Sequence, residues 1–140
     1  FFFFFFVPLT GKDVRKALLI FIWQREELLA GVETLPEQVL KHEFEGQRWT
    51  IESILEHIAR VEEWYFSRMG MEVTLPVENG NPLHLLEISS AATNHYLPQL
   101  IGFDQVFEHH QEKWSARKLV RRLLWHQRDH IDHIRDLALK

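Results

Sequence analysis

The chain has 140 residues, of which 46% are hydrophobic and 26% are charged, and its formal net charge is −4. This length suits one domain with a substantial core, and this composition is typical of soluble globular proteins. The acidic balance argues against a nucleic-acid partner, and the absence of cysteine excludes disulfides, thiolate metal sites and a cysteine nucleophile.

The chain opens with six phenylalanines, and we assign no function to this N-terminal segment, residues 1–11. No basic residue precedes the phenylalanines as in a signal peptide. The longest apolar run within a predicted helix, ALLIFIW at residues 17–23, is far shorter than the roughly 20 residues that a membrane span requires. We therefore expect no membrane association and a cytoplasmic protein.

Two helices are predicted in the first half of the chain. Thr10 and Asp13 have the spacing of a capping box, which predicts a helix over residues 12–30 that ends at Gly31. A connector containing a short turn of helix at Pro36 follows, and Thr50 then caps a helix over residues 51–69. The residues expected to face the core are Leu18, Leu19, Ile22, Leu28 and Leu29 in the first helix, and Ile51, Ile54, Leu55, Ile58, Val61 and either Trp64 or Tyr65 in the second.

Two more helices are predicted in the second half. Turn-forming residues make 70–81 a loop, with a brief extended piece over 71–75, and a third helix begins near Pro82 and runs to about residue 96. A connector over 101–114 is expected to hold a short helical turn, and Ser115 caps a last helix over 116–139. Four helices joined by two long connectors predict an all-α protein, a four-helix bundle.

The last predicted helix contains three of the nine histidines of the chain, in the stretch WHQRDHIDHI. His126 and His130 lie one helical turn apart, close enough to hold one metal ion between them. His57, at the edge of the apolar stripe of the second helix, is the best candidate for a third ligand. His133 lies about 10 Å along the axis from His126, too far to share an ion with it, and could instead pair with His130 or support a ligand.

The chain lacks the motifs of several rival chemistries, including Glu-x-x-His pairs, His-Glu-x-x-His, a Walker loop and a nucleophile elbow. A mononuclear histidine site is what remains. An isolated His-x-x-x-His pair also arises by chance in a chain with nine histidines, so the spacing alone leaves open a purely structural role.

Two stretches resemble the DinB/YfiT-like family: LPEQVLKHEFEGQRWTIESILEHIARVEEWY and KWSARKLVRRLLWHQRDHIDHI. The similarity spans roughly residues 12–138, so residues 12–140 would form one DinB-like domain. The resemblance implies an up-down-down-up bundle that is often a dimer. It also implies a divalent metal site, with zinc or nickel, on His57, His126 and His130. Characterised relatives include metal-dependent thiol transferases and maleylpyruvate isomerases.

Two functions of different class follow. The first is a metal-dependent enzyme, either a transferase with a low-molecular-weight thiol cosubstrate or a hydrolase. Its small-molecule substrate would lie in a pocket walled by Trp64, Tyr65 or Trp125. The alternative is a non-catalytic, dimerising module with a structural or vestigial metal site. No catalytic residue is assigned, and Glu62, Glu63 and Asp129 stay open as candidate general bases. Glu56 is adjacent to His57 in sequence but lies on a different face of the helix.

Overall fold

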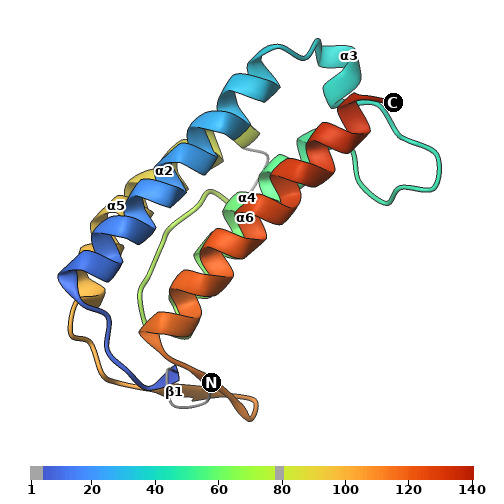
Figure 1. The fold of residues 1–140 in the computed structure, drawn as a ribbon. Helices are drawn as coiled ribbons and strands as arrows, with labels where there is room; N and C mark the ends of the chain where they lie inside the picture. Colours follow the sequence, from blue (N-terminus) through green and yellow to red (C-terminus); the bar gives the residue numbers. More distant parts are fainter. Residues whose placement is uncertain (1–4, 78–80) are drawn as a thin grey trace.

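The computed structural model describes residues 5–77 and 81–140 (Figure 1). Its long helices are α2 (Gly11–Glu33), α4 (Ile51–Arg68), α5 (Pro82–Tyr96) and α6 (Ala116–Ala138). Shorter elements are α3 (Glu37–Leu40), the 3₁₀ helix η1 (Leu97–Leu100) and the antiparallel strands β1 (Phe107–His109) and β2 (Glu112–Trp114). None of the helices in the described ranges combines the length and apolar character of a membrane span.

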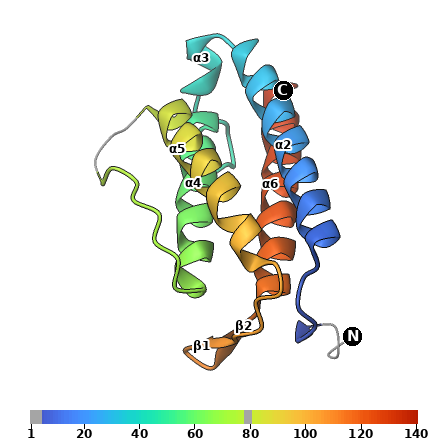
Figure 2. The same cartoon turned by 90° about the vertical axis from the view of Figure 1, so that its left-hand side faces the viewer.

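The long helices form the predicted four-helix bundle with up-down-down-up topology. In Figures 1 and 2, α2 rises from the end of the bundle near the N-terminus, α4 and α5 descend, and α6 rises again. Two helices can descend in succession because the connector after α4 runs back along the bundle before α5 begins (Figure 2). The strand pair closes the lower end, between α5 and α6. As a result α4 and α6 pack side by side and run antiparallel.

Side-chain caps fix where the long helices begin. The Thr10 hydroxyl accepts the Asp13 N–H while the Asp13 carboxylate accepts the Thr10 N–H, which confirms the capping box. Thr50 and Ser115 cap α4 and α6 through their hydroxyls, as predicted. The predicted stop at Gly31 is wrong, because α2 continues to Glu33. Burying Val32 in the core outweighs the small helix penalty of one glycine.

The predicted core face of α2 is wrong in part. Leu28 is buried as expected, but Leu19, Ile22 and Leu29 are 46%, 37% and 39% exposed. The buried face is instead built by Val14, Ala17, Phe21, Gln24, Arg25, Leu28 and Val32. This helix is apolar over much of its circumference, so periodicity did not single out the correct face.

The predicted stripe of α4 is confirmed for Ile51, Ile54, Leu55 and Ile58. At its end Tyr65 is buried and Trp64 is 45% exposed, which resolves the alternative left open by the sequence. One prediction for a connector is wrong, because residues 107–114 form a hairpin in place of a helical turn. Residues 71–75 form neither a helix nor a paired strand. His110 and Gln111 form the hairpin turn with φ values of 50° and 67°. Both positive angles fit a type I′ turn, but neither residue is a usual signal for one.

A buried polar network divides the bundle core into two apolar clusters. Arg25 of α2 forms an ion pair with Glu62 of α4 and donates a hydrogen bond to Gln127 of α6 at 2.6 Å. The Ser89 hydroxyl of α5 donates to the same glutamate. On each long helix these residues lie between the members of the two clusters, so the network ties all four helices together at one level.

Candidate metal centre

The bundle brings together the three histidines that the sequence singled out. His57 projects from α4, and His126 and His130 project from α6. One potential ligand atom from each of the three lies within 4.8 Å of the other two. The Nε2 atoms of His57 and His126 are 3.2 Å apart. No other group of three or more histidine, aspartate or glutamate side chains in the described residues has this compactness.

The packing of α4 against α6 explains why these rings meet. Ile54 and Ile58 are fully buried on α4, and Gln127 and Ile131 are buried on α6. A residue next to such an anchor along a helix lies about 100° around its axis, which places it at the edge of the interface. His57, His126 and His130 occupy these edge positions, so the three rings meet beside the contact between α4 and α6.

Burial keeps the three imidazoles uncharged. It lowers the pKa of His126 to about 3 and that of His130 to about 4, with smaller contributions from the neighbouring histidines. It also lowers the pKa of His57. A metal ion binds the neutral imidazole, so at neutral pH all three rings are in the form that ligates.

The chemistry of the site fits a divalent metal ion. The Nδ1 atoms of His126 and His130 are buried, and neither forms a hydrogen bond within the described part of the chain. In His126 the nitrogen that faces His57 is Nε2, so this ring would bind an ion through Nε2 and carry its proton on Nδ1. Tetrahedral zinc with nitrogen ligands at about 2.0–2.1 Å keeps two donors about 3.3 Å apart. The 3.2 Å between His57 and His126 is close to that spacing.

Aromatic side chains wall the triad. The Trp49 ring lies 4.5 Å from the His57 ring, and the Tyr65 ring lies 5.9 Å from the His126 ring, edge on at 90°. Burial raises the pKa of the Tyr65 hydroxyl, and the adjacent Arg122 guanidinium opposes that rise. Of the three predicted wall residues, only Tyr65 contacts a triad histidine. Trp64 packs on Tyr65 and Trp114, and Trp125 is 73% exposed.

The remaining histidines lie outside this group. His133 stacks 5.9 Å from His130, but its Nε2 lies 3.2 Å from the Gln47 side-chain oxygen. His95, near the end of α5, is exposed beside Tyr96 and Gln99.

None of the candidate general bases, nor Glu56, belongs to the group formed by the three histidines. Glu62 is buried in the ion pair with Arg25, and the Glu63 carboxylate accepts the Leu75 N–H. Glu56 lines a different hollow. Asp129 is exposed, and its charge only partly offsets the burial that lowers the pKa of His130. Among the described side chains, the Tyr65 ring lies beside His126 and the His133 ring beside His130, so both of these titratable groups contact the triad.

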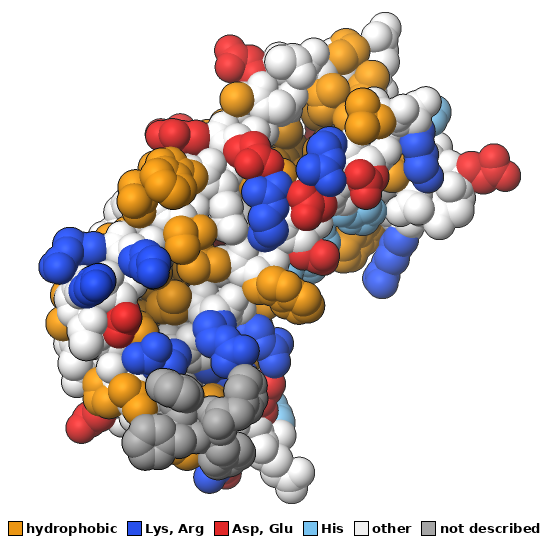
Figure 3. Space-filling model, in the orientation of Figure 1, with side chains coloured by type: hydrophobic (Ala, Val, Ile, Leu, Met, Phe, Trp, Pro, Cys, Tyr) orange, Lys and Arg blue, Asp and Glu red, His pale blue; other side chains and the backbone are white. Residues whose placement is uncertain are grey.

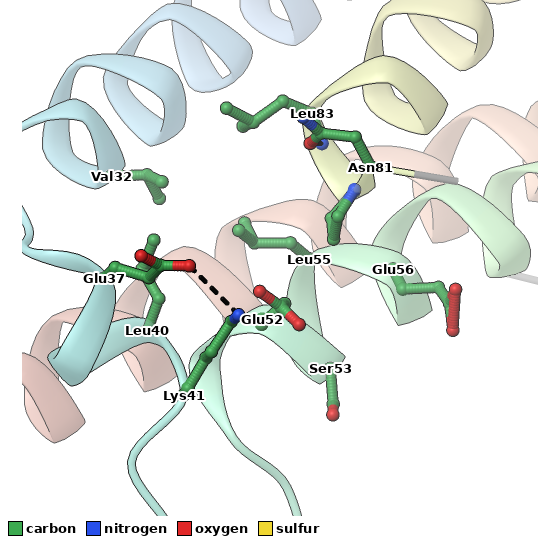
Figure 4. Close-up of a pocket in the computed structure, with 11 residues that line it drawn as sticks. Val32, Glu37, Leu40, Lys41, Glu52, Ser53, Leu55, Glu56, Asn81 and Leu83 are labelled. Atoms are coloured by element: carbon green, nitrogen blue, oxygen red, sulfur yellow. Dashed lines mark hydrogen bonds and ion pairs between the residues drawn. The ribbon is translucent and has the colours of Figure 1, made fainter. Parts of the chain in front are cut away.

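The hollow that Glu56 lines has a volume of about 530 Å³ and lies near the upper end of the bundle, between α2, α3, α4 and α5. Glu37 and Lys41 form a 3.0 Å ion pair within it, drawn dashed in Figure 4. Glu52 and Leu55 also line it, and they lie about 140–160° around α4 from His57. No histidine lines this hollow, so we place the candidate chemistry at the triad.

Sequence reasoning missed Trp49 and Arg122 as neighbours of the triad. Trp49 precedes the cap of α4 by one residue, and a sequence gives no sign that such a residue turns back over His57. Arg122 lies four residues before His126, and that spacing was a usable signal because it places both on one helix face.

Comparison with known proteins agrees with this architecture. The model of the DinB family matches residues 10–133. A solved structure of YfiT from Bacillus subtilis, described as a probable metal-dependent hydrolase with an unusual four-helix bundle topology, matches with a TM-score of 0.72 and 17% sequence identity. The match covers 93% of this chain and 88% of that one, and at this identity it shows a shared fold. No curated protein matches the chain.

Proposed function

The chain belongs to the DinB family, and from this membership and its histidine triad we propose that it is a divalent-metal-dependent enzyme acting on a small molecule. The ligands are His57, His126 and His130, and the ion is zinc or nickel, because neutral imidazoles suit both. The observation that carries this proposal is the convergence of three neutral imidazole donors within 4.8 Å of one another.

Three protein ligands leave one position of a tetrahedral ion open. When bound, the ion would lower the pKa of a thiol or water at that position and supply a nucleophile near neutral pH. We propose thiol transfer from a low-molecular-weight thiol, or hydrolysis, as the reaction. A thiol would have to come from a cosubstrate, because the chain contains no cysteine.

The surrounding residues prepare the site for such chemistry. The Trp49 ring packs on His57 and His130, and the Tyr65 ring packs on His126, so the three imidazoles have aromatic neighbours. The Tyr65 hydroxyl is protonated at neutral pH, because the pKa of a tyrosine is ordinarily near 10 and burial raises it here. It can therefore donate a hydrogen bond to charge that develops on a substrate.

The test is an activity screen of protein loaded with zinc or nickel. Thiol transfer from small thiols to electrophilic substrates and hydrolysis of small esters and amides are measured beside a His126→Ala/His130→Ala variant. We expect one of the two activities in the native chain, and no activity in the variant. Equal rates in both proteins would contradict the proposal.

The alternative, a non-catalytic module with a structural metal site, predicts a different result. In that case removal of the metal would unfold the native chain, and the loaded protein would show neither activity. Circular dichroism with and without a chelator therefore separates the two functions.

A further inference from the structure

The first half of α6 carries a cluster of cations although the chain as a whole is acidic. Figure 3 shows Lys and Arg side chains gathered over this half of the helix. Several cations of α6 are neutralised by a carboxylate: Arg117 by Asp13, Lys118 by Glu112, and Arg128 by Glu27 and Asp132. Arg122 is exposed and forms no ion pair with any residue that the structure describes. Its charge also acts on Glu112, which Lys118 holds at 3.0 Å.

Arg122 lies next to the triad. It precedes His126 by one helical turn, about 6 Å along the axis of α6. Its guanidinium lies beside the Tyr65 hydroxyl and 5.9 Å from the centre of the Trp114 ring. The Tyr65 ring in turn contacts both Trp114, at 5.8 Å, and His126, at 5.9 Å. An N–H donor, a hydroxyl donor and an aromatic surface therefore lie together at one end of the site.

We propose that Arg122 and the Tyr65 hydroxyl form a subsite for a carboxylate on the substrate or thiol cosubstrate, with the reacting atom of that molecule at the triad. This inference rests on the proposed function, because it assigns the triad as the reacting end. A guanidinium binds a carboxylate through two parallel hydrogen bonds, and a neighbouring hydroxyl can donate a third. One arginine and one tyrosine match the single charge of a carboxylate. The Tyr65 ring lies 5.9 Å from the His126 ring, which suits a molecule with a few bonds between its two ends.

The test uses cobalt-loaded protein and two thiols of equal chain length, 3-mercaptopropionate and the neutral 3-mercaptopropanol. Thiolate binding to the cobalt is followed by its charge-transfer absorption. We expect the native chain to bind the acid about tenfold more tightly than the alcohol, the size of one charge-assisted hydrogen bond. Arg122→Gln and Tyr65→Phe should reduce this preference, and Arg122→Lys should keep part of it.

Arg121→Gln is the matched control, because it removes the same charge from the neighbouring position and should preserve the preference. Metal content and circular dichroism of every variant are measured first, and Arg122→Gln should match the native chain in both. Absence of cobalt uptake by the native chain would overturn the proposed function and this inference with it. Normal cobalt uptake with equal affinity for the two thiols, or an unchanged preference in Arg122→Gln, would overturn the subsite alone.

Discussion

The three triad imidazoles are neutral because the packing of α4 against α6 partly buries them. Burial lowers the pKa of His126 to about 3 and of His130 to about 4, from an ordinary value of 6.5. Near neutral pH a metal ion therefore does not have to displace protons from these two ligands, and proton competition for them begins only well below pH 6.

The depressed pKa values predict how the metal-free protein responds to acid. Above pH 6.5 the two rings are neutral in the folded and unfolded chains and contribute no pH dependence. Between pH 6.5 and about 4 the unfolded chain binds protons that folded His126 and His130 do not, so the free energy of unfolding falls as the pH falls. Urea unfolding at pH 7, 6 and 5 should show a steeper loss for the native chain than for His126→Gln/His130→Gln. Equal slopes would contradict the burial of these rings.

His133 tests how sharply the structure defines the ligand set. Its Nε2 contacts Gln47 and lies outside the triad, so His133→Gln should leave zinc affinity nearly unchanged. His130→Gln removes a ligand and should lower affinity by more than the roughly 10–100-fold that loss of an outer-shell partner costs. Calorimetric titration with zinc measures both. Equal losses in the two variants would place His133 among the ligands.

At the scale of the helix, α2 makes a clear prediction about Gly31. This glycine lies inside the helix, and an added Cβ would meet no atom within 4 Å. Gly31→Ala should therefore raise the free energy of unfolding by about 0.5–1 kcal/mol. Gly102→Ala is the control. This residue also has open space around it but a φ of +71°, so alanine there should destabilise the protein. Stabilisation by both substitutions would show that backbone conformation does not control the effect.

The polar network between the two core clusters makes a second prediction at this scale. Glu62→Gln leaves the buried Arg25 guanidinium without its counter-ion and should cost about 3–5 kcal/mol. Arg25→Met/Glu62→Leu removes both charges and should recover most of that loss. Urea unfolding followed by circular dichroism measures each variant. If the double variant were less stable than Glu62→Gln, the ion pair itself would be the main source of stability at this level.

Helix boundaries were predictable wherever a side-chain cap marked them, as at Thr10, Thr50 and Ser115. The buried face of α2 was not, because its choice depends on Arg25 meeting Glu62 and Gln127 from other helices. The hairpin before α6 was missed because its turn uses His110 and Gln111. Helix caps depend on residues close together in the sequence and can be predicted from it. Contacts between helices depend on residues far apart in the sequence and could not be predicted here.

For the site, the sequence identified His57, His126 and His130 from helix spacing, and the family resemblance pointed to the same residues. The positions of the aromatic neighbours and of Arg122 beside the triad depend on how α4 and α6 pack.

At the scale of the whole molecule, the exposed apolar face of α2 is another feature that only the structure reveals. Figure 3 shows hydrophobic side chains over this helix, where the exposed residues are Leu19, Ile22, Trp23 and Leu29.

We predict that the protein is a homodimer and that the exposed face of α2 forms its interface. Trp23, at 60%, is the most exposed of these four residues, so Trp23→Glu should convert the dimer to a monomer. Trp125→Glu, on α6, is the control and should leave the dimer intact. Sedimentation velocity measures all three proteins. A monomeric native chain, or dissociation by Trp125→Glu alone, would contradict this assignment.

The central claim is that the bundle holds one divalent ion on His57, His126 and His130. The most direct measurement is metal content per chain after purification without an affinity tag and after incubation with zinc or nickel. The native chain is compared with His126→Ala/His130→Ala. The claim predicts close to one ion per native chain and none in the variant. Native protein that binds no ion under either condition, or a variant that binds as much as the native chain, would contradict it.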